Sequence, residues 1–138
     1  MLLLDTHIWI WSVEGEDRRV NPESRRRILR AESADLVRVS PVSLFEVTYL
    51  SQAGRLHWTR SVEQWIEKAL YPSGIRLAEL TAEIAIDAGH IPKTALADPM
   101  DRLLVATARQ LGATLMTADR AILAYARTGR VRVHDASR

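Results

Sequence analysis

The sequence has no cysteine. Disulfide bonds, thiolate nucleophiles and cysteine-based zinc sites are therefore excluded, and any bound metal ion must use oxygen or imidazole ligands. The four histidines, His7, His57, His90 and His134, are scattered along the chain without the spacing of a helical ligand pair, so they do not indicate zinc. We therefore expect any metal chemistry to depend on carboxylate oxygens.

Long hydrophobic runs are also missing. No stretch of about 18 apolar residues is present that could span a bilayer. The apolar residues 1–4 meet Asp5 at once, without a basic leader or a cleavage site. We therefore expect a cytoplasmic protein with no membrane partner. The chain has 138 residues, of which 47% are hydrophobic and 26% charged, and this suits one domain covering residues 1–138.

Short β-prone stretches alternate with helical stretches along most of the chain. Strands are predicted at residues 2–4, 36–39, 75–80, 114–116 and 131–134. Helices are predicted at 8–13, from Asn21 and Pro22 onward, from Ser40 and Pro41 to about 53, from Thr81 to about 89, and from Asp98 and Pro99 to 112. Because parallel strands need helical crossovers, this alternation predicts an α/β fold with a mainly parallel central sheet.

Five acidic residues follow predicted strands or lie near the start of the next helix. Asp5 ends the first strand, Glu46 lies in the second turn of the helix after the second strand, and Asp119 follows the fourth strand. Asp98 and Asp101 open a late helix. In open α/β sheets, sites form beyond the carboxyl ends of the strands, so one sheet edge can gather all five acids.

Two of these acids lie on helix faces that are predicted to contact the core. The residues three, four and seven positions further on share the face of a helical residue. They are Tyr49, Leu50 and Ala53 for Glu46, and Leu104, Val105 and Ala108 for Asp101. Two carboxylates within ~4 Å repel by about 4 kcal/mol at an effective dielectric of 20. Such a cluster needs protons, basic partners or a divalent cation, and oxygen ligands suit Mg²⁺ or Mn²⁺.

The charges outside this acidic set are mostly basic. Setting the five acids aside leaves 12 of the 17 Asp and Glu residues against 19 Lys and Arg, a balance of +7. A metal ion held by the acidic cluster, with basic residues around it, could bind the negatively charged phosphodiester backbone of a nucleic acid. The metal, as one ion or as a pair, would polarise the scissile phosphate and lower the pKa of a bound water so that the water attacks as hydroxide. The pattern therefore predicts a nuclease.

Four segments resemble, in the same order, the acidic motifs of PIN-domain ribonucleases of the VapC toxin type. They are LLLDTHIWIW at 2–11, SPVSLFEVTYL at 40–50, ADPMDRLLVATA at 97–108 and TLMTADRAI at 114–122. One acid followed by a hydroxyl residue is a weak signal, but four motifs in sequence are specific, and the resemblance spans essentially the whole chain.

The resemblance implies a three-layer α/β/α PIN-like domain that cleaves RNA with Mg²⁺. It further implies that the chain is the toxin of a type II toxin-antitoxin pair, forms a homodimer and is neutralised by a small antitoxin encoded beside it. By the same resemblance, the catalytic, metal-binding carboxylates are Asp5, Glu46, Asp101 and Asp119, with Asp98 as a further metal ligand and Thr6 and Thr117 as supporting hydroxyl residues.

Structural roles compete with metal binding for several of these acids. Asp98 before Pro99 has the signature of a helix N-cap, which satisfies backbone donors without any metal. Asp101 could serve as a capping-box partner, although its apolar neighbours favour the site. Asp5 could simply end a strand, and Asp119 could simply start a turn.

Tryptophan and arginine side chains leave further alternatives open. Trp9 and Trp11, beside the first motif, could stack on a base, but a core or dimer contact is the stronger interpretation. Trp58 and Trp65, spaced by seven on a predicted helix, could lie in the core or in a partner groove. The arginines between positions 25 and 30 could be a solvated helix face or an RNA contact.

Other functions remain to be weighed against a ribonuclease. A non-catalytic metal-binding or RNA-binding regulatory module would not need four carboxylates in one pit. A phosphatase of similar topology would need a second acid two residues after Asp5, where His7 stands instead. A DNase stays open, because nothing in the sequence reads the 2′-hydroxyl.

Overall fold

The computed structural model describes residues 1–16 and 18–138. Its strands form one sheet in the order β3-β2-β1-β4-β5, and each neighbouring pair is parallel. The strands are β1 (Leu2–Leu4), β2 (Val37–Val39), β3 (Arg76–Leu77), β4 (Thr114–Thr117) and β5 (Val133–Asp135). The predicted α/β fold with a parallel sheet is therefore confirmed.

Helices connect the strands, and most of them begin at the predicted caps. Asn21, Ser40, Thr81 and Asp98 each accept a hydrogen bond from a backbone N–H in the first turn of the following helix. The helices are α1 (Thr6–Glu14), α2 (Pro22–Ser33), α3 (Pro41–Gln52), α4 (Val62–Ala69), α5 (Ala82–His90), α6 (Pro99–Leu111) and α7 (Arg120–Ala126), with a short 3₁₀ helix η1 (Tyr71–Ser73) after α4.

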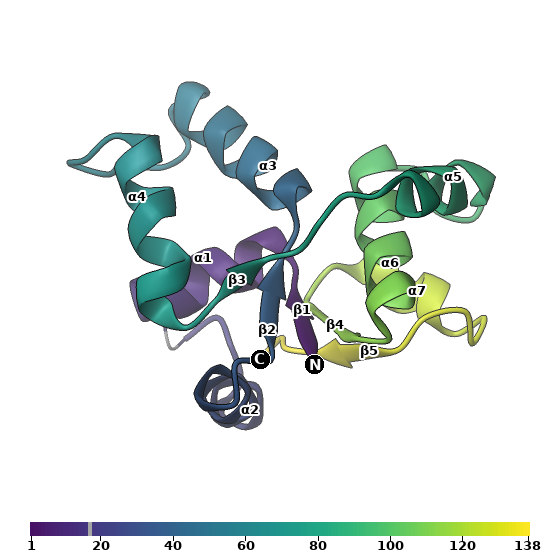
Figure 1. Cartoon of the computed structure of the whole chain (residues 1–138), viewed down its shortest axis with the longest axis horizontal. Helices are drawn as coiled ribbons and strands as arrows, with labels where there is room; N and C mark the ends of the chain where they lie inside the picture. The colour runs from purple at the N-terminus through teal and green to yellow at the C-terminus, as the bar shows by residue number, and fades with distance from the viewer. Residues whose placement is uncertain (17) are drawn as a thin grey trace.

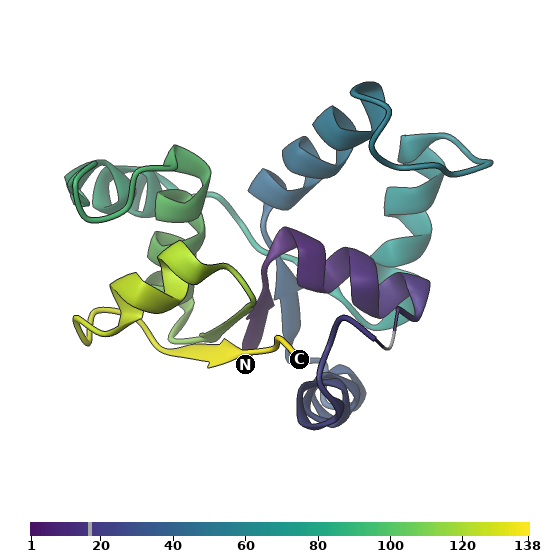
Figure 2. The ribbon, with the colours of Figure 1, turned by 180° about the vertical axis from the view of Figure 1, so that it is seen from behind.

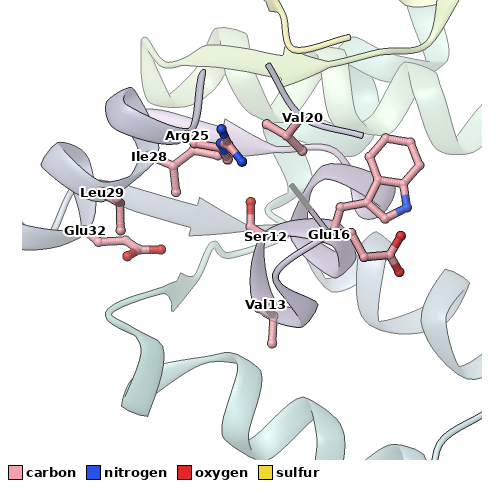
Figure 3. Close-up of a pocket in the computed structure, with 9 residues that line it drawn as sticks. Ser12, Val13, Glu16, Val20, Arg25, Ile28, Leu29 and Glu32 are labelled. Atoms are coloured by element: carbon pink, nitrogen blue, oxygen red, sulfur yellow. The ribbon is translucent and has the colours of Figure 1, made fainter. Parts of the chain in front are cut away.

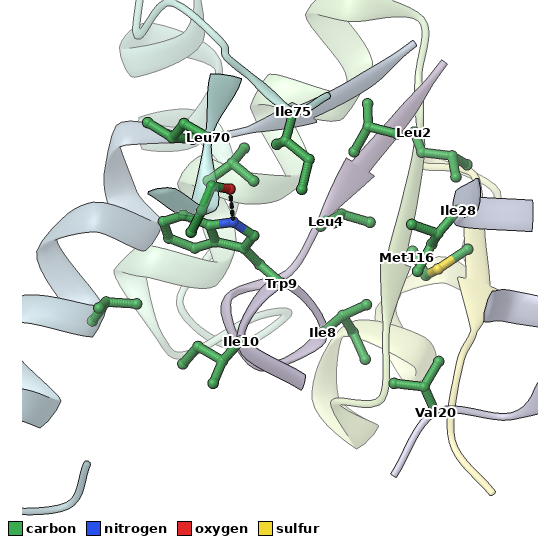
Figure 4. Packing of buried hydrophobic residues seen from close by; sticks show 14 of the residues in the cluster. Leu2, Leu4, Ile8, Trp9, Ile10, Val20, Ile28, Leu70, Ile75 and Met116 are labelled. Atoms are coloured by element: carbon green, nitrogen blue, oxygen red, sulfur yellow. Dashed lines mark hydrogen bonds between the residues drawn. The ribbon is translucent and has the colours of Figure 1, made fainter. Parts of the chain in front are cut away.

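Helices cover both faces of the sheet, giving three layers. Figures 1 and 2 show α1, α2 and α4 on one side of the strands, and α5, α6 and α7 on the other. Side chains of β1 alternate between the two faces. Leu2 and Leu4 join the core cluster that includes α1 and α4, whereas Leu3 packs with α6 and α7. In the first cluster, the buried Trp9 donates from Nε1 to the Ala69 carbonyl at 2.9 Å (Figure 4).

Three features differ from the sequence-based expectation. The strand predicted at 75–80 pairs only at Arg76 and Leu77, because β3 is an edge strand with a neighbour on one side. Trp58 lies before α4 rather than on it, and its ring stacks on Trp65 at 4.4 Å and 5°. Helix α7 follows Asp119, where only a turn was considered. Asp17, which lies between the helices predicted at 8–13 and from Asn21 onward, is outside the described residues.

The order of the strands creates a switch point between β1 and β4. From β1 the chain continues to β2 and β3 on one side, and β4 and β5 are added on the other. Leu4 is opposite Met116, so the carboxyl ends of β1 and β4 lie side by side. Open α/β sheets bind ligands at such a point.

No helix in residues 1–16 or 18–138 combines the length and apolar character needed to cross a membrane.

Candidate functional site

A cleft of about 480 Å³ lies at the switch point, and all five predicted acids line it. Asp5 follows β1, Glu46 comes from α3, Asp98 and Asp101 come from the start of α6, and Asp119 precedes α7. The expected gathering of distant acids at one sheet edge is therefore observed.

Asp5 is fixed at the centre of the cleft by hydrogen bonds on both sides. Its N–H donates to the Met116 carbonyl at 2.9 Å, which ties it to β4. Its Oδ1 accepts from the Thr6 N–H at 2.8 Å and caps α1, and its Oδ2 accepts from the Thr117 hydroxyl at 2.6 Å. The carboxylate therefore has a defined orientation without any bound ion.

Thr6 and Ser43 hold Glu46. The fully buried Thr6 hydroxyl lies 2.8 Å from Glu46 Oε1 and 2.8 Å from Ser43 Oγ. With a single proton, it donates to the carboxylate and accepts from the serine. Sequence reasoning missed Ser43, although its place one helical turn before Glu46 puts both on the same side of α3.

The helix face predicted for Glu46 was wrong, although Glu46 does line the cleft with the other acids. The buried residues of α3 are Val42, Ser43 and Val47, whereas Tyr49 is 61% exposed. Glu46 lies at the border of the buried face, half-buried, because it faces the cleft and not the core.

Asp101 is the acid with the least support from its surroundings. It is half-buried above Leu104, Val105 and Ala108, which are buried as predicted. No hydrogen bond or ion pair joins its carboxylate to any residue in the described ranges. Burial, followed by the charges of Asp119 and the other acids of the cleft, raises the pKa of Asp101 to about 8.

Burial also raises the pKa of Asp5 and of Glu46. For Asp5, hydrogen bonds from Thr117 and Thr6 oppose the effect, and for Glu46 the hydrogen bond from Thr6 opposes it. Neighbouring carboxylates add to the rise in both cases. We call Asp5, Glu46 and Asp101 the floor of the cleft, because all three are half-buried and costly to ionise.

Asp98 and Asp119 form the exposed rim of the cleft, and both are helix N-caps. Asp98 Oδ1 accepts from the Met100 N–H at 2.9 Å. Asp119 Oδ1 accepts from the N–H groups of Ala121 and Ile122 at 2.8 and 3.0 Å. The capping interpretation of Asp98 is confirmed, and Asp119 starts a helix and not a turn. Each rim carboxylate still has a second oxygen.

The donor set of the cleft fits a hard divalent cation. All five side chains offer oxygen, and none of them forms an ion pair with a residue of the described chain. Their mutual repulsion is therefore not balanced by Lys or Arg. As the side chains stand, no three acidic or histidine residues in the described ranges are close enough to form a ligand group. Binding would require them to draw together around the ion.

Aromatic and basic side chains, which we call a wall, line the same cleft as the acids. It consists of His7 and Trp11 of α1 and Arg19 of the following loop. The rings of His7 and Trp11 are 5.6 Å apart and tilted by 50°, and Arg19 Cζ lies 5.3 Å from the Trp11 ring centre. The sequence placed Trp9 and Trp11 together, but Trp9 is fully buried and only Trp11 reaches the cleft.

A second, more apolar groove of about 340 Å³ lies between α1 and α2 and shares Trp11 with the acidic cleft. Figure 3 shows Ile28 and Leu29 of α2 on one side of this groove and Val13 of α1 on another. Arg25 also lines it, so this member of the arginine cluster is not simply a solvated side chain.

Comparisons with known proteins agree with the geometry. Residues 2–128 match the family model described as PIN domain. A curated protein, Ribonuclease VapC22 of Mycobacterium tuberculosis, is 30% identical over 124 residues, which are 90% of this chain and 91% of that protein.

Two of the solved structures of similar fold come from Salmonella typhimurium and Rickettsia felis. DNA-bound VapBC from Salmonella typhimurium gives a TM-score of 0.69 at 20% identity, covering 97% of this chain and 96% of that one. VapBC2 from Rickettsia felis, bound to a promoter DNA fragment, gives 0.68 at 19% identity, covering 99% and 98%. At these identities the likeness concerns the fold.

Proposed function

This chain belongs to the PIN domain family, and we propose that it is a divalent-metal-dependent endoribonuclease acting as the toxin of a toxin-antitoxin pair. The main support is the cleft at the switch point, where five carboxylates from distant parts of the chain meet and none forms an ion pair with a residue of ranges 1–16 and 18–138. The relative named Ribonuclease VapC22 supports RNA as the substrate.

Asp5, Glu46, Asp101 and Asp119 would hold the Mg²⁺ or Mn²⁺ ion, with Asp98 as a further ligand. When bound, the ion supplies Lewis acidity toward the scissile phosphate and lowers the pKa of water. The residues of the chain prepare this site in advance. Thr117 and Thr6 orient the carboxylates of Asp5 and Glu46, so less conformational freedom is lost on binding.

The test is hydrolysis by the purified full chain of three substrates: a structured RNA, single-stranded DNA and a phosphomonoester, each with Mg²⁺ or with excess EDTA. We expect cleavage of RNA that stops in EDTA and returns with Mg²⁺ or Mn²⁺. A parallel preparation of Asp101→Asn controls for contaminating nucleases. RNA cleavage in EDTA, or preference for DNA or the phosphomonoester, would contradict the proposal.

The proposed partners are a small antitoxin and a second copy of the chain, in the cytoplasm where cellular RNA is found. Several structures of similar fold are described as VapBC or toxin-antitoxin complexes, which supports the antitoxin. For the homodimer, Phe45 and Tyr49, one turn apart on α3, are 60% and 61% exposed. Co-expression with the neighbouring small gene and measurement of mass in solution, with and without that gene, test both.

A further inference from the structure

Part of the lining of the acidic cleft has a composition that metal binding does not explain. His7, Trp11 and Arg19 contribute an imidazole, an indole and a guanidinium, and the last two groups are not metal ligands. The side chains are also arranged around one ring, because His7 and Arg19 both contact Trp11. We call these three residues the α1 wall.

The core does not need Trp11 to be at this position. Trp9 carries the buried role on α1, with no exposed surface and its N–H bonded to Ala69. Trp11 packs only partly against the core, and it lines both the acidic cleft and the apolar groove between α1 and α2. A large apolar ring left partly in water beside a polar site commonly indicates a ligand contact.

Arg19 is held loosely over this ring. Its guanidinium pairs with Glu16 at 3.0 Å, but both side chains are exposed, and exposed pairs contribute little to stability. Its Cζ lies 5.3 Å from the ring centre, within the range of a cation–π contact, but such contacts of exposed side chains contribute little. Arg19 can therefore leave the ring at little cost.

We propose that the α1 wall is the nucleotide-binding subsite of the cleft, where a base next to the scissile phosphate stacks on Trp11. Arg19 then moves from the ring to the RNA backbone and contacts a phosphate, and His7 borders the base on the other side. This assignment rests on the proposed ribonuclease function. Aromatic stacking accepts any base, so the wall supplies affinity for a single-stranded region and not a sequence code.

The experiment measures binding in EDTA, where no cleavage occurs. Two fluorescein-labelled strands of about 12 nucleotides are compared: oligoadenylate RNA and the same backbone with stable abasic residues. Both carry the same phosphate charge, so the ratio of their Kd values isolates the contribution of the bases. The proteins compared are the wild type, Trp11→Ala, Trp11→Phe and Trp58→Ala. Trp58→Ala is the matched control, because Trp58 is also a half-buried tryptophan but does not line the cleft.

We expect the wild type and Trp58→Ala to prefer the base-bearing strand by about 5- to 100-fold, the range for stacking of one base. Trp11→Ala should lose this preference, and Trp11→Phe should keep part of it, which separates stacking from general damage to the fold. A ratio that stays at the wild-type value in Trp11→Ala would overturn the inference.

Cleavage assays separate this inference from the proposed function. With Mg²⁺, Trp11→Ala should raise KM for RNA with a smaller change in kcat, whereas the control Trp58→Ala should leave both values near those of the wild type. If the wild type cleaves RNA but binds both strands equally, the inference fails alone. If the base preference is present and depends on Trp11 but no RNA is cleaved, the proposed function fails alone.

Discussion

The floor and the rim of the acidic cleft contain the same chemical group in opposite settings. The floor residues Glu46 and Asp101 lie within helices, half-buried, and burial raises the pKa of each. The rim residues Asp98 and Asp119 are exposed and satisfy backbone donors at the starts of α6 and α7. Carboxylates that line one cleft therefore contribute to the free energy of unfolding with opposite sign: the floor lowers it and the rim raises it.

The largest expected effect is on the floor. Asp101→Asn should reduce Mg²⁺-dependent cleavage by at least about 100-fold, more than the loss of an outer-sphere partner usually costs. It should also raise the melting temperature of the metal-free protein, because a half-buried charge without a partner is removed. Cleavage rates and thermal unfolding in EDTA measure both, with Glu67→Gln on α4 as an exposed control. A less stable but active variant would contradict the comparison.

The floor should also make the metal-free protein less stable as pH rises. The pKa of Asp101 is about 8 in the folded protein against an ordinary value of 3.8, so between these values the folded chain keeps a proton that the unfolded chain has lost. Stability contributed by this group is thus fully present below about pH 4, falls as pH rises toward 8, and is constant above that.

Urea unfolding of the metal-free protein at pH 5.5, 7 and 8.5, values chosen at roughly even steps across this window, measures the effect. The free energy of unfolding of Asp101→Asn should depend less on pH than that of the wild type. Some decrease with rising pH should remain, because the pKa values of Asp5 and Glu46 are also raised. Stability that increases from pH 5.5 to 8.5 would show that the floor is not costly to ionise.

A smaller effect is expected from the hydroxyl that links the floor to the rim. Thr117 donates to Asp5 Oδ2 at 2.6 Å and accepts from the Asp119 N–H at 2.9 Å. Thr117→Val keeps the shape but removes both bonds, so Mg²⁺ affinity should fall about tenfold. Thr117→Ser is the matched control and should stay near the wild type. Titration of activity against Mg²⁺ gives the apparent affinity. Equal Mg²⁺ affinities of Thr117→Val and Thr117→Ser would show that the Thr117 hydroxyl does not support the metal site.

The smallest effect is expected at the rim. Asp98→Ala should lower the free energy of unfolding by about 1 kcal/mol through the lost cap of α6, the reverse of the change at Asp101. Cleavage should be reduced but detectable. Asp98→Ser, which keeps a capping oxygen, should recover most of the stability. If Asp98→Ala is stable and inactive, Asp98 belongs functionally to the floor.

The residues that the sequence could identify are those whose role follows from local rules. Caps followed by proline predicted the starts of α2, α3 and α6, and acids after strands predicted the membership of the cleft. The resemblance added Thr6 and Thr117. The depth of each acid in the cleft could not be predicted. Asp101 is half-buried and Asp98 is exposed, and this difference depends on how α6 packs against its neighbours in the fold.

The errors have the same origin. The apolar stripe after Glu46 faces solvent at Tyr49, since the packing of α3 selected another face. Base stacking by Trp11 was considered, but His7 and Arg19 were not placed beside its ring, because Arg19 approaches Trp11 only in the folded chain. Helix α7 is short, at seven residues, and was read only as a turn.

The central place of β1 has a consequence for the synthesis of the protein. Asp5 and Thr117, which share a hydrogen bond in the cleft, are 112 positions apart, and β1 pairs with β4 along its full length. A chain growing on a ribosome therefore carries Asp5 almost from the beginning but cannot complete the cleft until β4 and Asp119 have emerged. Contacts so distant in sequence also form slowly. A chain with this topology therefore has no complete acidic cleft while the segment from Asp5 to Asp119 is still being synthesised.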